Sequence, residues 1–167
     1  MTGPITLSCN CGHVELALTG TPILTASCYC DDCQAGGHGI GALPGAPPVV
    51  GADGGTPSVL YRRDRAAWNR GDDLLVRHKL RPGSPTNRVV ASCCNTPMLV
   101  DFDRGPHWVA VYLGRFRAGA PPMEMLVNTR FKPAGAILPV DVPAYSYFPL
   151  RFVTRLLGAR IAMLLHA

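Results

Sequence analysis

Seven cysteines fall in three short clusters, and their spacing constrains the fold of this 167-residue chain more than any other feature. The clusters are Cys9-Asn-Cys11, the segment "SCYCDDCQ" with Cys28, Cys30 and Cys33, and the adjacent pair Cys93 and Cys94. The odd number argues against a complete disulfide framework. The N-terminus has no basic start and no long apolar run, so we expect no secretory leader and a reducing, cytoplasmic environment. In such a compartment thiols more often bind metal or do chemistry than pair.

Zinc geometry divides the seven cysteines into four and three. Zinc holds thiolates at about 2.3 Å in a tetrahedron, so its ligand sulfurs must come within about 4 Å of one another. Residues i and i+2 of an extended chain point to the same side, and Gly12 allows a turn after Cys11. Such a Cys-x-Cys pair, joined by a second pair from a distant strand, would close a four-thiolate site whose metal stabilises the fold.

The middle cluster, defined as Cys28, Cys30 and Cys33, needs no distant partner. Three protein ligands with an open fourth position are typical of a reactive zinc, which lowers the pKa of the water or substrate thiol bound there. We interpret the missing fourth ligand as the substrate's place, with Asp31 and Asp32 adding negative charge that helps to hold a cation. Three alternatives stay open: a structural zinc closed by Asp or His, a redox pair at Cys30-x-x-Cys33, and cysteines that hold no metal.

Many short strands separated by turns favour a mainly β domain of sheet or barrel type. We expect two strands within 5–18 and further strands at 23–30, 58–61, 74–80, 88–94, 98–102 and 107–114. Residues 33–48 are rich in Gly and Pro, which predicts a short helical turn and then a loop. A helix is predicted at 150–167, packed on the sheet, with a membrane-surface or dimer contact as the alternative. Its apolar face is predicted to consist of Leu150, Val153, Leu156, Leu157, Ile161, Leu164 and Leu165.

Length and composition predict one domain over residues 1–167. Within it we expect a zinc-binding β core over 5–115, and a Pro-rich segment with the C-terminal helix over 116–167. The net charge is +5, from 16 Lys+Arg against 11 Asp+Glu, and the arginines are spread from Arg62 to Arg160, so no nucleic-acid partner is expected. No stretch approaches the roughly 18 apolar residues of a spanning helix, so no membrane insertion is expected.

Three segments resemble one known family. Cys9-Asn-Cys-Gly before an alternating strand, Cys28-Tyr-Cys-Asp-Asp-Cys-Gln, and "CCNTPM" (93–98) are similar to the glutathione-dependent formaldehyde-activating enzymes. That family includes centromere protein V-like domains and shares the Mss4-like β fold. Together with "GGT" (54–56), these segments look like a bacterial subgroup of the family. The resemblance covers roughly residues 7–115, and it implies a mainly β fold of antiparallel sheets or a barrel with zinc sites.

The resemblance also implies a set of metal ligands. In the family, the first Cys-x-Cys and a late Cys-x-x-Cys hold a structural zinc. These ligands map to Cys9, Cys11 and Cys94, with Ala91 in the fourth position and Cys93 as the nearby substitute. Adjacent cysteines share a metal only where the backbone bends unusually. The middle cluster maps without gaps onto the family's catalytic zinc ligands, so one or two Zn²⁺ per chain and a catalytic role for the middle cluster are implied.

The implied reaction forms or cleaves a carbon–sulfur bond in the adduct of an aldehyde with glutathione or a related thiol. Zinc would keep the substrate sulfur as thiolate, its nucleophilic form. The expected partner is therefore a small thiol or aldehyde, and a homodimer is possible. The alternative is a non-catalytic zinc-binding module for protein interaction, in which both metals are structural.

Overall fold

Two β-sheets and two α-helices make up the computed structural model, which describes residues 3–117 and 119–165. Its strands are β1 (Ile5–Ser8), β2 (Glu15–Leu18), β3 (Leu24–Cys28), β4 (Thr56–Arg62), β5 (Ala66–Arg70), β6 (Leu75–His78), β7 (Thr86–Ala91), β8 (Thr96–Phe102), β9 (Trp108–Tyr112) and β10 (Met125–Val127). The helices are α1 (Asp31–Gly41) and α2 (Leu150–Leu165), and short 3-10 turns are η1 (Arg63–Arg65), η2 (Asp72–Leu74), η3 (Leu113–Arg115) and η4 (Thr129–Phe131).

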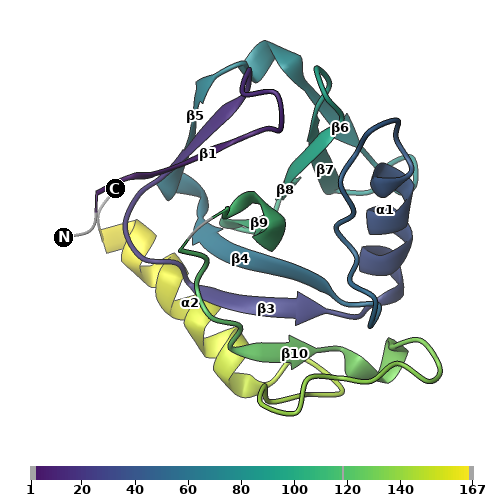
Figure 1. Ribbon diagram of the computed structural model, residues 1–167. Helices are drawn as coiled ribbons and strands as arrows, with labels where there is room; N and C mark the ends of the chain where they lie inside the picture. The colour runs from purple at the N-terminus through teal and green to yellow at the C-terminus, as the bar shows by residue number, and fades with distance from the viewer. Residues whose placement is uncertain (1–2, 118, 166–167) are drawn as a thin grey trace.

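The larger sheet has seven strands in the order β10-β3-β4-β9-β8-β7-β6, and the smaller has three in the order β1-β2-β5. Neighbouring strands pair antiparallel except β10, which runs parallel to β3. Figure 1 shows β3 and β4 crossing the molecule, with α1 on one side and α2 passing diagonally beside the beginnings of β3 and β10 on the other. The chain is thus mainly β with a C-terminal helix and metal-competent cysteine clusters, which confirms the predicted fold class and is consistent with an Mss4-like fold.

Alternation along the strands gives the seven-stranded sheet a core on each face. On β4, Val59 and Tyr61 pack with Leu16 and Leu18 of the three-stranded sheet. Leu60, between them in sequence, packs on the opposite face with Phe152 of α2. The face of the larger sheet that meets α2 also carries Cys28, so this face positions the middle cluster.

Helix α2 packs on the sheet as expected, but through a different face from the predicted one. Phe152 is buried, and Leu156 and Ala159 are partly buried beside it. Of the predicted apolar face, all except Leu156 are exposed: Leu150, Val153, Leu157, Ile161, Leu164 and Leu165. The bulky Phe152 sets the contact, because its ring fills the space over β3, β4 and β10. The predicted last residues of the helix, 166–167, lie outside the described residues.

Three further elements were missed or predicted too short, because their sequences are polar, Pro-rich or Gly-rich. β5 was not expected, because its "AAWNR" sequence ends in two polar residues, yet it pairs antiparallel with β2. β10 was not expected within the Pro-rich segment, and its three residues pair with β3. The prediction of only a short helical turn after residue 33 is wrong, because α1 is 11 residues long. Packing of Gly36 and Gly37 against other elements outweighs the low helix propensity of glycine.

Among the described residues, no helix has the length and apolar character that crossing a bilayer requires.

Candidate metal centres and active site

The outer cluster consists of Cys9, Cys11, Cys93 and Cys94, and the structure brings all four sulfurs within 4.8 Å of one another. Cys9 and Cys11 come from the turn between β1 and β2, and Cys93 and Cys94 from the turn between β7 and β8. Cys9 Sγ lies 3.5 Å from Cys11 Sγ and 3.8 Å from Cys93 Sγ, and Cys11 Sγ lies 3.3 Å from Cys93 Sγ. Segments more than 80 residues apart therefore meet at this point, as the four-plus-three division predicts.

A tight turn allows the adjacent Cys93 and Cys94 to point into the same cluster. Ala91 pairs with Thr96, so residues 92–95 form the hairpin loop. Asn95 takes the left-handed conformation at φ 50°, and Cys94 N donates to Ala91 O at 3.3 Å. The two sulfurs end 3.9 Å apart. This is the unusual bend that adjacent ligands require, and Cys93 supplies the sulfur that Ala91 lacks.

The outer cluster fits a closed thiolate site. A tetrahedron with zinc–sulfur bonds of about 2.3 Å has sulfur–sulfur edges of about 3.8 Å, and the observed separations of 3.3 to 3.9 Å are close to this value. Val14 N donates to Cys9 Sγ at 3.3 Å, so the backbone of the turn also holds this sulfur in place. The buried Arg115 donates to Asn10 Oδ1 at 2.9 Å, and it supplies positive charge near the cluster. Burial lowers the pKa of this guanidinium.

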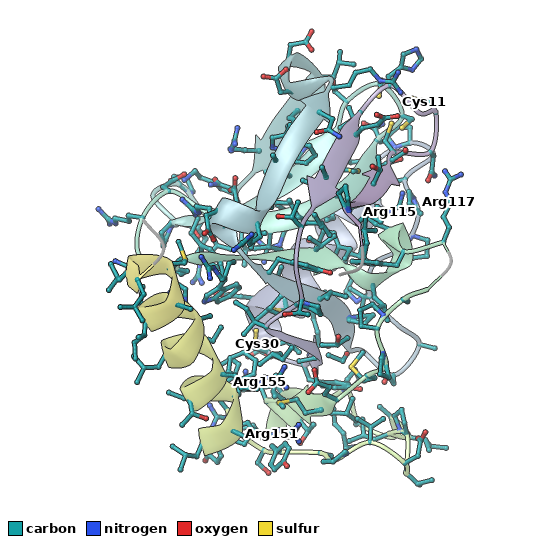
Figure 2. All side chains as sticks on the ribbon, turned by 90° about the vertical axis from the view of Figure 1, so that its left-hand side faces the viewer. Cys11, Cys30, Arg115, Arg117, Arg151 and Arg155 are labelled. Carbon is teal, nitrogen blue, oxygen red and sulfur yellow. The ribbon has the colours of Figure 1, made fainter. Side chains whose placement is uncertain are left out.

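The middle cluster is assembled by a strand, a two-residue link and the first turn of a helix. Cys28 ends β3, Cys30 is the residue before α1, and Cys33 lies in the first turn of α1. Cys30 O accepts from Cys33 N at 3.0 Å, which closes that turn. The positive end of the helix dipole favours thiolates at this place. Figure 2 shows Cys30 beside α2 and Cys11 near the opposite end of the molecule, so the two clusters are separate.

Buried contacts hold the peptide that links Cys28 to Cys30. Between them, Tyr29 is fully buried, and its hydroxyl donates to Asp53 Oδ2 at 2.5 Å. Gln34 Nε2 donates to Tyr29 O at 2.6 Å and to Phe131 O at 2.9 Å. Asp53 Oδ1 in turn accepts from Gly55 N at 3.0 Å. The "GGT" segment and the glutamine of "CYCDDCQ" therefore serve to fix the backbone that carries the sulfurs.

The middle cluster also fits a cation. Its three sulfurs lie within 4.8 Å of one another. Hydrogen bonds from the Cys30 and Cys33 thiols lower the pKa of Cys28 to about 3, against burial, and Asn128 Nδ2 donates to Cys28 Sγ at 3.5 Å. The pKa of Cys33 is raised, because it lies beside Cys28 and Cys30. One thiolate is thus stable alone, and three require a cation to balance their charge.

Among the described residues, no Asp, Glu, His or further Cys joins the three sulfurs of the middle cluster. The Asp32 carboxylate accepts from Arg81 Nη2 at 2.9 and 3.1 Å instead, and Asp31 is exposed. His38 is exposed on α1, away from the sulfurs. The two clusters therefore differ, because one gathers four sulfur atoms and the other three.

The middle cluster lines a cavity of about 290 Å³ on the face of the seven-stranded sheet that meets α2. The strands contribute alternate residues, as period-two geometry requires. One row across the sheet runs Leu60, Ala110, Val100 and Arg88, each paired with the next. Phe152 of α2 and Phe148, which lies two residues before the helix begins, close the cavity. Apart from the cysteines, its lining is mostly apolar, with hydroxyls at Thr56, Ser58, Ser84 and Thr86 and charges at Asp32 and Arg88.

Two polar groups of the cavity wall lack partners. Arg88 is 5% exposed, and it donates through Nη2 to Asp32 O, whereas its Nη1 is buried without a hydrogen-bond partner. Thr56 pairs with Cys28 across β3 and β4, and its buried hydroxyl also has no partner. Unpartnered buried polar groups are costly, and they often mark places where a ligand supplies the missing contact.

Sequence reasoning brought together the seven cysteines but missed Arg88, Thr56 and Asn128. Arg88 looks like an ordinary strand residue, and only the pairing of β7 with β8 shows that it faces the cavity. Asn128 lies in the Pro-rich segment, for which the sequence predicted no element. In the structure its φ is 58°, a left-handed backbone conformation that is uncommon for residues other than glycine.

Comparison with known proteins bears on the first part of the chain. No curated protein matches its sequence. A crystal structure of a Rhodobacter sphaeroides protein, solved as a structural-genomics target, is 16% identical, with a TM-score of 0.48 over 70% of this chain and 92% of that chain. The family model described as glutathione-dependent formaldehyde-activating enzyme matches residues 4–44, which include Cys9, Cys11 and the middle cluster. Over these residues the resemblance to the glutathione-dependent formaldehyde-activating enzymes is confirmed.

Proposed function

We propose that the chain is a zinc-dependent enzyme of the carbon–sulfur lyase type, which forms or cleaves the adduct of an aldehyde with glutathione or a related thiol. The asymmetry between the clusters carries this proposal. The outer cluster offers four sulfurs, and the middle cluster offers three beside a cavity that is large enough for a small molecule. A structural zinc is fully coordinated by the protein and needs no cavity beside it. A reactive zinc needs one open coordination position that a small molecule can reach.

In this proposal Cys28, Cys30 and Cys33 hold one zinc, and the outer cluster holds a second, structural one. When bound at the middle cluster, zinc supplies a positive charge that keeps a substrate sulfur as thiolate at neutral pH. Gln34 and Asp53 hold the linking peptide, so the three sulfurs keep their positions while substrate exchanges. Cys9, Cys11, Cys93 and Cys94 stay outside the reaction, because they line the other site.

The chemistry is an addition without oxidation or reduction. The substrate sulfur forms a bond to the carbonyl carbon, the π pair of the C=O bond moves to oxygen, and that oxygen takes up the proton that left the thiol, through water. Arg88 Nη1 and the Thr56 hydroxyl, both without partners, are the groups that we assign to the developing alkoxide oxygen. Cleavage is the same step in reverse.

Exchange NMR tests the proposal directly. In the zinc-loaded protein, we expect faster interconversion of ¹³C-formaldehyde plus glutathione with the S-hydroxymethyl adduct than in buffer. Cys30→Ser should abolish this acceleration while one zinc per chain and the unfolding temperature are largely retained. Cys93→Ser is the matched control, and its main effect should be lower stability.

The alternative of a non-catalytic zinc module predicts another pattern. If both sites are structural, Cys30→Ser and Cys93→Ser destabilise the fold equally, and the wild-type protein leaves the exchange rate at its value in buffer. A metal-free protein that cycles between a Cys30–Cys33 disulfide and dithiol would instead favour the redox reading.

A further inference from the structure

Two aromatic pairs line part of the cavity wall. Phe102 and Trp108 meet edge to face with ring centroids 4.7 Å apart. Phe148 and Phe152 form the second pair, also at 4.7 Å. Both pairs line the cavity that contains the middle cluster. Four aromatic rings around one space form a surface suited to a flat or bulky apolar group.

Charged partners are scarce in the same cavity. Arg88 is the one cationic residue among its described lining residues, and the carboxylate of Asp32 already accepts from Arg81. Glutathione carries two carboxylates and an ammonium group, and each would need a partner when it leaves water. The lining therefore matches poorly with a tripeptide thiol and well with an apolar one.

The size of the cavity agrees with its chemistry. A volume of about 290 Å³ is roughly twice that of the 150 Å³ apolar cavity that accommodates benzene. A ring therefore fits together with the reacting carbon and sulfur. Formaldehyde and a one-carbon adduct would leave most of the apolar wall without contact.

Contacts from three segments hold the helical side of this wall in place. Arg155 Nη1 donates to Glu124 Oε2 at 2.5 Å, and Thr25 N donates to Glu124 Oε1 at 3.2 Å, which ties α2 to β3. His107 Nε2 donates to Leu156 O at 2.8 Å, next to Trp108. Figure 2 shows Arg151 and Arg155 on α2 below Cys30. The aromatic wall is thus preformed, and it needs little ordering when a ligand binds.

We propose that the adduct handled at the middle cluster carries an apolar group about the size of one aromatic ring, which lies between the Phe102–Trp108 and Phe148–Phe152 pairs. This inference rests on the proposed function and specifies its substrate class. The apolar group belongs to either the thiol or the aldehyde, since both parts of the adduct share the cavity. Phe148 is the residue that determines specificity, because it lines the cavity and is half exposed, at the boundary between the cavity and solvent.

The test compares substrate pairs in the zinc-loaded protein. The two apolar arms are benzyl mercaptan with formaldehyde, and 2-mercaptoethanol with benzaldehyde. The reference arms are 2-mercaptoethanol or glutathione with formaldehyde. We expect kcat/KM for at least one apolar arm to exceed both references at least about tenfold. Which arm is favoured tells whether the ring belongs to the thiol or the aldehyde.

A second measurement is independent of turnover. Benzyl methyl thioether cannot form an adduct, because its sulfur carries no hydrogen, and a 4-fluoro derivative reports its binding by ¹⁹F NMR. We expect saturable binding that Phe148→Ala weakens about tenfold, together with a similar fall in the ratio of apolar to reference kcat/KM. Leu157→Ala is the matched control, because Leu157 lies on α2 with 58% exposure and does not line the cavity.

The outcomes separate this inference from the proposed function. Turnover of all four pairs at similar kcat/KM, without thioether binding, overturns the inference and supports the proposed reaction. Thioether binding that depends on Phe148, without turnover of any pair, supports the apolar ligand class and overturns the reaction. Equal effects of Phe148→Ala and Leu157→Ala on thioether binding also overturn the inference.

Discussion

The guanidinium group of Arg88 occupies the space that a side chain at Gly36 would fill. A Cβ atom built on Gly36 would lie 1.8 Å from Arg88 Nε and 1.9 Å from its Cζ. The helix α1 that carries Cys33 and the strand β7 that carries Arg88 therefore approach closely only because residue 36 is glycine. This contact fixes the cation of the cavity relative to the middle cluster.

Gly36→Ala should lower activity although alanine favours helices more than glycine does. The new methyl group displaces Arg88, and we expect a loss of roughly 10- to 100-fold in kcat for adduct formation, with zinc content unchanged. Gly39→Ala is the control on the same helix, because a Cβ there meets no atom within 4 Å. Activity at wild-type level in Gly36→Ala would contradict the role assigned to Arg88.

Cys94→Ser should destabilise the fold. The outer cluster joins two turns far apart in sequence, and a metal held there contributes its binding free energy to folding. We expect the free energy of unfolding in urea to fall by an amount on the order of several kcal/mol, and a chelator to lower the wild-type unfolding temperature by a similar mechanism. A wild-type unfolding temperature that does not respond to the chelator would contradict a structural metal.

Gln34→Leu should loosen the segment that carries the middle cluster. Its amide donates to two backbone carbonyls, those of Tyr29 and Phe131, and their loss should cost about 1–3 kcal/mol in the free energy of unfolding. Zinc affinity at the middle cluster should fall too, because Tyr29 lies between two of its cysteines. Gln34→Glu has the same shape but cannot donate, so it should be at least as unstable as Gln34→Leu. If Gln34→Glu left the free energy of unfolding unchanged, these hydrogen bonds would not stabilise the segment.

Several short strands were predictable because short apolar runs are separated by turn signals. Val59, Leu60 and Tyr61 of β4 and Val109 and Val111 of β9 belong to such runs, and a short 3-10 turn follows each of these strands. The grouping of Cys9 with a late pair was predictable for a different reason. Metal ligands obey distance rules that hold whatever the rest of the fold does.

The cavity was not predictable, because it depends on pairing between strands and on the docking of a helix. Thr56 faces Cys28, and Arg88 faces Val100, only in the observed register. Phe152, and not most of the leucines of α2, packs against the sheet, and this depends on the shape of the sheet surface that the helix contacts. The length of helix α1 was not predictable for the same reason, since the close approach of Arg88 to Gly36 and of Val50 to Gly37 exists only in the folded chain.

Cobalt substitution tests the central claim most directly, because the d–d spectrum and the sulfur-to-cobalt charge transfer of Co²⁺ report its ligands. With two Co²⁺ per chain, adding benzyl mercaptan should change the spectrum saturably and add one thiolate to one of the two sites. In Cys30→Ser, which retains only the outer cluster, the thiol should change nothing. A wild-type spectrum that is indifferent to the thiol would contradict an open position at Cys28, Cys30 and Cys33, as would a middle cluster that binds no cobalt.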